Sequence, residues 1–192
     1  QEDYPQAIKY LEECLRLNPL SPQAHNSLAR VYIILDNSEK ALFHALKAKE
    51  LSQELRNLHY NLAQIYELKG ELLRAEAEYL AEIETYPDNF NASFNLALLY
   101  RRMKDDLKEE LFLKKTIETN PRFPLGYLFL GELYSGKEAL EEKAISHLEQ
   151  ALSLGLDKKH LKLAYYLLAK IYLKQGKERL ASDYAQRIKQ LE

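Results

Sequence analysis

Apolar positions in this chain recur with the period of an α-helix. Between Tyr4 and Leu17 they fall at i, i+3, i+4, i+7 and i+8, and the residues are Ala7, Ile8, Leu11, Cys14 and Leu15. This spacing places them on one face of a helix. The pattern returns along the whole chain, and no stretch of useful length alternates as a β-strand would. The chain is therefore predicted to be entirely helical.

Proline, glycine and capping residues indicate where the helices begin and end. Asn18-Pro19 ends the first helix, because proline disfavours the helical conformation of the residue before it. Ser21-Pro22 opens the second, with serine as N-cap and proline in the first turn. These signals predict eleven helices at about 4–17, 22–35, 38–51, 55–69, 72–85, 90–103, 107–119, 124–134, 140–154, 159–174 and 177–191.

A pentad of leucine, a small residue, two variable residues and tyrosine recurs five times. Its copies begin at Leu28, Leu62, Leu96, Leu130 and Leu168. The first four are 34 residues apart and the last follows after 38. Recurrence on a fixed period indicates an array of structural repeats.

The pentad, an alanine nine residues after its tyrosine and a proline near the end of the repeat resemble the tetratricopeptide repeat. In the second full repeat the matching residues are Leu62, Ala63, Tyr66, Gly70, Ala75, Tyr79 and Pro87. The resemblance implies an all-α fold, a right-handed α-solenoid of antiparallel helix hairpins. It also implies that the first helix of each hairpin lines a concave groove.

We expect one array over residues 1–192. It would comprise a half repeat with only the second helix at 1–21, then repeats at 22–55, 56–89, 90–123, 124–158 and 159–192. Because the first and last helices would have uncovered apolar faces, we hypothesise that the chain is an excerpt of a longer solenoid.

Two residues depart from the repeat pattern, and the single cysteine is interpreted separately. Glu82 and Glu109 stand where small residues are usual, so the helix pairs are expected to splay there or the glutamates to reach the edge. Cys14 is the single cysteine, which excludes an internal disulfide, and it is interpreted as a small core residue.

Composition and motifs exclude several classes of function. The net charge of -2 argues against a generic nucleic-acid binder. No apolar run approaches the ~20 residues that a membrane span needs. There is no glycine-rich phosphate loop, no Cys-x-x-Cys and no His-Glu-x-x-His. We therefore expect no enzymatic activity, no cofactor and no metal, and we interpret His44, His147 and His160 as solvated.

The resemblance locates candidate peptide-binding residues on the first helices. The polar candidates are Gln23, Ser27, Asn57, Asn61, Asn91 and Asn95, in pairs spaced i, i+4, with Arg30 as the only cation among them. An asparagine amide both donates and accepts, so it can pair with any peptide backbone. The alternative is that Asn61 and Asn95 bond within the scaffold and tie adjacent repeats together.

Apolar residues take over these positions later in the chain. The candidates are Leu125, Leu128, Phe129 and Tyr166, which could form a trough beside the polar ladder. The alternative is that some of them belong to the core.

We expect the chain to be a protein–protein interaction scaffold that binds a peptide or partner segment in its groove. Two alternatives stay open. One is a non-catalytic arm of a larger enzyme or assembly. The other is a module that self-associates through its terminal helices, at Tyr4–Leu17 and Tyr184–Leu191.

Overall fold

The computed structural model describes residues 3–52 and 54–191. That part of the chain contains eleven α-helices, one short 3-10 helix and no strand. The elements are α1 (Tyr4–Leu17), α2 (Pro22–Ile34), α3 (Ser38–Leu51), α4 (Leu58–Leu68), α5 (Leu72–Thr85), α6 (Phe90–Met103), α7 (Asp106–Thr119), α8 (Pro124–Ser135), η1 (Glu138–Leu140), α9 (Glu141–Leu154), α10 (Lys158–Lys174) and α11 (Glu178–Gln190). The predicted all-α fold is confirmed.

The start of most helices follows the local sequence signals, and α4 is the exception. Ser21 accepts a hydrogen bond from the backbone N–H of Ala24 and caps α2, as predicted. Helix α4 begins at Leu58, three residues later than the sequence indicates. The reason is Asn57, whose φ of 64° lies in the left-handed region and therefore cannot continue a right-handed helix.

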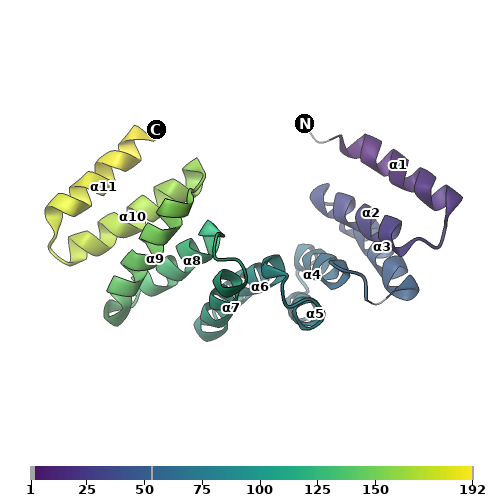
Figure 1. Ribbon diagram of the computed structural model, residues 1–192, viewed down its shortest axis with the longest axis horizontal. Helices are drawn as coiled ribbons and strands as arrows, with labels where there is room; N and C mark the ends of the chain where they lie inside the picture. The colour runs from purple at the N-terminus through teal and green to yellow at the C-terminus, as the bar shows by residue number, and fades with distance from the viewer. Residues whose placement is uncertain (1–2, 53, 192) are drawn as a thin grey trace. The chain divides into compact units, whose positions relative to one another are not determined.

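The chain divides into two compact units, Gln1–Leu99 and Tyr100–Glu192. In the first unit α2 packs on α3 and α4 on α5, and α1 packs on α2 (Figure 1). In the second unit α8 packs on α9 and α10 on α11. Each unit also contains a helix that stacks on the preceding pair, because α4 contacts both α2 and α3, and α10 contacts both α8 and α9.

The pentads form the inward face of each hairpin. All five pentad leucines are fully buried: Leu28, Leu62, Leu96, Leu130 and Leu168. The small residue that follows each leucine lets the paired helix approach closely. A Cβ added to Gly131 would lie 2.7 Å from Cγ of Leu148 in α9, a distance that packed side chains do not tolerate.

Two sequence interpretations are wrong. Glu82 and Glu109 do not reach the edge of the helix pairs, because both side chains are buried. Cys14 is exposed and does not belong to the core. Helix α1 packs on α2. Its residues Ile8, Leu11 and Leu15 contact the hydrophobic core, whereas Cys14 is not among the residues that contact it.

Within residues 3–52 and 54–191, no helix combines the length and the apolar composition that crossing a membrane would require.

Candidate functional site

The first unit has a polar cleft between α2 and the start of α4. Its volume is about 280 Å³, and we call it the α2–α4 cleft. The residues that line it are Gln23, Asn26, Ser27, Arg30, Leu55, Arg56, Asn57 and Asn61. Five of the candidates from the sequence therefore lie together: Gln23, Ser27, Arg30, Asn57 and Asn61.

One face of α2 supplies the exposed wall of the cleft. Gln23, Ser27 and Arg30 follow one another at i, i+4 and i+7 and are exposed. The residues on the opposite face, such as Ala24 and Leu28, are buried against the core. The amphipathic pattern of α2 thus fixes the direction in which these three polar side chains point.

Asn61 forms the floor of the cleft and ties α4 to α2. Its side chain is only 2% exposed, and its Nδ2 donates to Oδ1 of Asn26 at 2.8 Å. Nδ2 of Asn26 in turn donates to the Arg56 carbonyl at 3.4 Å. Oδ1 of Asn61 is buried and has no hydrogen-bond partner among the described residues. The floor of the cleft therefore holds a buried acceptor that no described residue satisfies.

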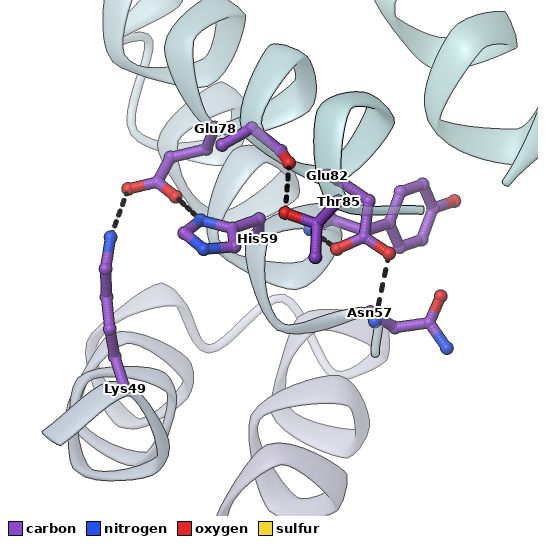
Figure 2. A network of polar contacts seen from close by, with 8 residues as sticks. Lys49, Asn57, His59, Glu78, Glu82 and Thr85 are labelled. Carbon is purple, nitrogen blue, oxygen red and sulfur yellow. Dashed lines mark hydrogen bonds and ion pairs between the residues drawn. The ribbon is translucent and has the colours of Figure 1, made fainter. Parts of the chain in front are cut away.

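Glu82 holds the loop that closes the cleft. Its carboxylate accepts hydrogen bonds from the backbone N–H groups of Asn57, at 3.0 Å, and Tyr60, at 3.3 Å (Figure 2). Asn89 also donates to Glu82, at 2.8 Å, and to Oδ1 of Asn57, at 3.0 Å. A carboxylate at the first turn of α4 satisfies N–H groups that have no partner within the helix and complements the helix dipole.

A second carboxylate fixes the orientation of α4. Glu78 of α5 binds Lys49 of α3 at 2.9 Å and His59 of α4 (Figure 2). Burial of Glu78 opposes its ionisation, but the hydrogen bonds from His59 and Lys49 outweigh burial and lower the pKa of the carboxyl group. The three side chains link three helices of the first unit.

Glu78 and Glu82 belong to this arrangement, and no pattern in the sequence predicts their roles. Glu82 stands 25 residues after Asn57 in the chain, and Glu78 stands 19 residues after His59. Their roles depend on how α5 packs against α4, and no local motif reports that packing. The one available signal is the large acidic residue at position 82, where the first repeat has Ala48 and the third has Thr116.

The charged side chains that line the cleft are two arginines, Arg30 and Arg56. Arg56 pairs with Asp88 at 2.8 Å and lies over the Tyr86 ring. Arg30 is exposed and forms no hydrogen bond or ion pair within residues 3–52 and 54–191. The cleft lining includes no Asp or Glu. It therefore offers a free guanidinium, an amide acceptor, and side chains such as Gln23 that donate and accept.

Asn95 repeats the role of Asn61 one hairpin later. Its Nδ2 donates to the Tyr60 hydroxyl at 3.0 Å, and Asn95 is half-buried. Burial, only partly offset by this hydrogen bond, raises the pKa of Tyr60. Asn91 is exposed on α6. Neither asparagine lines the α2–α4 cleft.

The apolar candidates of the second unit differ in how exposed they are. Leu128 is fully buried, which places it in the core, and Leu125 and Phe129 are half-buried. The Arg101 guanidinium lies over the Phe129 ring, 4.9 Å from its centre. Tyr166 differs, because 56% of its surface is exposed.

All three histidines that the sequence suggests are solvated, His44, His147 and His160, are half-buried. His44 lies with Nδ1 3.0 Å from Nδ1 of His25, and burial lowers the pKa of both, that of His44 to about 4. His147 lies against the rings of Tyr127 and Tyr134, and its burial lowers its pKa. The described residues contain no group of three or more His, Cys, Asp or Glu side chains that could hold a metal ion.

Comparison with known proteins identifies the repeat and the fold. Residues 10–43 match the family model described as tetratricopeptide repeat. No curated protein matches the sequence.

Several solved structures share the fold over nearly the whole chain. Against pilF of Pseudomonas aeruginosa the TM-score is 0.83 with 21% identity, covering 98% of this chain and 84% of that chain. PilW, described as a widely conserved type IV pilus biogenesis factor, gives 0.78 with 20% identity, covering 97% and 85%. YrrB, described as a TPR protein with an unusual peptide-binding site, gives 0.74 with 15% identity, covering 95% and 92%. At these identities the likeness shows the fold alone.

Proposed function

We propose that this chain, whose residues 10–43 match the tetratricopeptide repeat model and whose fold is that of YrrB, a TPR protein, binds an extended segment of a partner protein in the α2–α4 cleft. The fold itself supports a general role as a scaffold for protein interactions.

The observation that carries the proposal is the unsatisfied acceptor in the cleft. Oδ1 of Asn61 is buried without a hydrogen-bond partner among the described residues, which is costly for a polar atom. A backbone N–H of a bound peptide would supply the missing donor. Because every peptide unit except that of proline has an N–H group, this contact favours an extended backbone over a particular side chain.

The wall of α2 supplies the complementary contacts. From Gln23 to Arg30 the helix rises by roughly 10 Å, which matches about three residues of an extended chain. Gln23 and Ser27 can each donate or accept, and the Arg30 guanidinium can bind a carbonyl or a carboxylate. The absence of Asp and Glu from the lining favours a segment that carries an acidic side chain near Arg30.

Hydrogen bonds within the chain hold the residues of the cleft in place. Glu82 and Asn89 hold the loop that presents Asn57, and the amide of Asn61 is held by Asn26. A peptide would therefore meet groups that are already in place, which lowers the entropic cost of binding. The likeness in fold to YrrB, described as having a peptide-binding site, is consistent with this role.

Selection from a random peptide library tests the proposal without a known partner. The purified chain is used to select binders, and a selected peptide is titrated into isotope-labelled protein while amide shifts are followed by nuclear magnetic resonance. We expect the largest shifts in Gln23–Arg30 and in residues 55–61. A library that yields no binder, or a binder whose shifts fall outside these segments, contradicts the proposal.

A further inference from the structure

The two arginines of the α2–α4 cleft differ in what they bind within the chain. Arg30 forms no hydrogen bond or ion pair within residues 3–52 and 54–191. Arg56 is already engaged, because its Nη2 lies 2.8 Å from Oδ2 of Asp88. One guanidinium of the cleft is therefore free, and the other is held by a carboxylate of the protein itself.

Asp88 reaches Arg56 from a different loop. Arg56 lies just before α4, and Asp88 lies 32 residues later, between α5 and α6. Asp88 is not among the residues that line the cleft. The Arg56 guanidinium lowers the pKa of the Asp88 carboxyl group, so Asp88 is ionised at neutral pH. The contact shows that this arginine takes a carboxylate as its partner.

The ion pair is open to exchange because it is exposed. The side chain of Arg56 is 51% exposed and that of Asp88 is 68% exposed. Exposed ion pairs contribute little to stability, since water solvates both partners well when they separate. A carboxylate on a segment that is already bound in the cleft has a high effective concentration at Arg56. It therefore competes with Asp88 for the guanidinium.

Tyr86 holds the Arg56 guanidinium through a different surface of that group. The guanidinium lies over the Tyr86 ring, 5.3 Å from its centre. The Tyr86 hydroxyl donates to the backbone carbonyl of Glu54, which fixes the ring. Stacking on a ring uses the face of the guanidinium and leaves the N–H groups at its edge for a carboxylate. Tyr86 would therefore keep Arg56 at the cleft after Asp88 leaves it.

On the basis of the peptide binding proposed above, we infer that the bound segment carries two acidic side chains. One binds Arg30, and the other replaces Asp88 at Arg56. Asp88 then acts as an internal competitor, which a neutral or basic side chain cannot displace. Because no Asp or Glu lines the cleft, the exchange leaves both ligand carboxylates facing an arginine with no acidic neighbour in the lining. The ion pair thus selects doubly acidic segments.

Library selection against charge variants tests this chemistry. Binders are selected in parallel with the wild type, Arg56→Gln and Arg30→Gln, and the selected sequences are aligned. We expect two acidic positions in the wild-type consensus and one in the consensus of each variant. Arg122→Gln changes an exposed arginine outside the cleft and is the control, which should select the same two positions as the wild type.

Asp88→Asn tests the competition directly. The change removes the carboxylate that competes with the ligand, so a peptide selected with the wild type should bind about two- to fivefold more tightly. Glu84→Gln removes one negative charge from the exposed side of α5 and should leave the affinity unchanged. The gain is expected to disappear when Asp88→Asn is combined with Arg56→Gln. Because both side chains are exposed, folding should be unaltered, which circular dichroism checks.

Two results would overturn the inference and leave the proposed function standing. One is a set of peptides that bind in the cleft with a single acidic position or none. The other is a peptide whose affinity Asp88→Asn does not raise. In both cases the amide shifts still fall in Gln23–Arg30 and in residues 55–61. A library that yields no binder in the cleft contradicts the proposed function and the inference together.

Discussion

The side-chain amide of Asn61 donates to the side-chain oxygen of Asn26, 2.8 Å away, and so joins two consecutive hairpins of the first unit. Asn61 lines the α2–α4 cleft, and its remaining oxygen is buried without a partner among the described residues. One residue thus unites the two interpretations that the sequence leaves open. Its nitrogen serves the scaffold, and its buried oxygen is the acceptor that the proposed peptide would satisfy.

Replacement of Asn61 by alanine is expected to reduce stability. The change removes the hydrogen bond to Asn26 and leaves the buried Oδ1 of Asn26 without that donor, which costs about 1–3 kcal/mol of the free energy of unfolding. Urea unfolding followed by circular dichroism measures the loss. Asn91→Ala, on the exposed face of α6, is the control and should change little. Equal stability of the two variants would show that the contact does not support the scaffold.

Glu82→Gln is expected to destabilise the start of α4. The carboxylate accepts from two backbone N–H groups and from Asn89, and an amide in its place brings a donor against these donors. The expected cost is about 1–3 kcal/mol of the free energy of unfolding. Glu84→Gln makes the same chemical change on the exposed side of α5 and serves as the control. A Glu82→Gln variant as stable as this control would contradict the capping role.

Glu109 is expected to make the protein less stable as the pH rises. Burial, only partly offset by Arg101, raises its pKa to about 7, whereas an unfolded glutamate titrates near 4.5. Between these values the unfolded chain loses its proton before the folded chain does, so the free energy of unfolding falls with rising pH.

Glu109→Gln removes this titration. The variant is expected to exceed the wild type in stability at pH 8 by on the order of 1–3 kcal/mol, and to match it near pH 4. Urea unfolding at the two pH values measures the difference. A difference that does not change with pH would show that the Glu109 carboxyl is ionised normally in the folded protein.

His44 has the opposite effect in the first unit. Burial and the neighbouring charges of His25 and Lys40 lower its pKa to about 4, below the ordinary 6.5. As the pH falls through this range the unfolded chain binds a proton that the folded chain does not, so stability is lost. His44→Phe keeps an aromatic ring beside Tyr32 and should make the loss between pH 7 and pH 4 shallower. Thermal unfolding at several pH values in this range measures the loss of stability. If the variant loses stability with falling pH as steeply as the wild type, the lowered pKa of His44 is contradicted.

The repeating core was predictable from the sequence because it depends on local periodicity. The pentad leucines and the small residues after them recur on a fixed spacing, and all five leucines are buried as that spacing indicates. The helix boundaries follow from prolines, glycines and N-caps such as Ser21. The division of the chain into numbered repeats stays a prediction.

Residues that break the repeat were harder to interpret. Glu82 and Glu109 occupy positions of small residues, and only the packed structure shows that one caps a neighbouring helix while the other is buried beside Arg101. Asn57 was identified as a candidate, but its left-handed backbone was not, because Glu82 and Asn89 stabilise that conformation from a distance in sequence. Because these contacts join residues that are far apart in the sequence, they leave no local pattern in it.

The most direct test of the proposed function is the dissociation constant of a library-selected peptide for the wild type and for Arg30→Glu. Arg30 is exposed and unpaired among the described residues, so the reversal of charge should leave folding intact. Arg122→Glu makes the same change on an exposed arginine outside the cleft and is the control. We predict binding at least tenfold weaker for Arg30→Glu and unchanged for Arg122→Glu. Equal affinity of all three proteins would contradict peptide binding in the α2–α4 cleft.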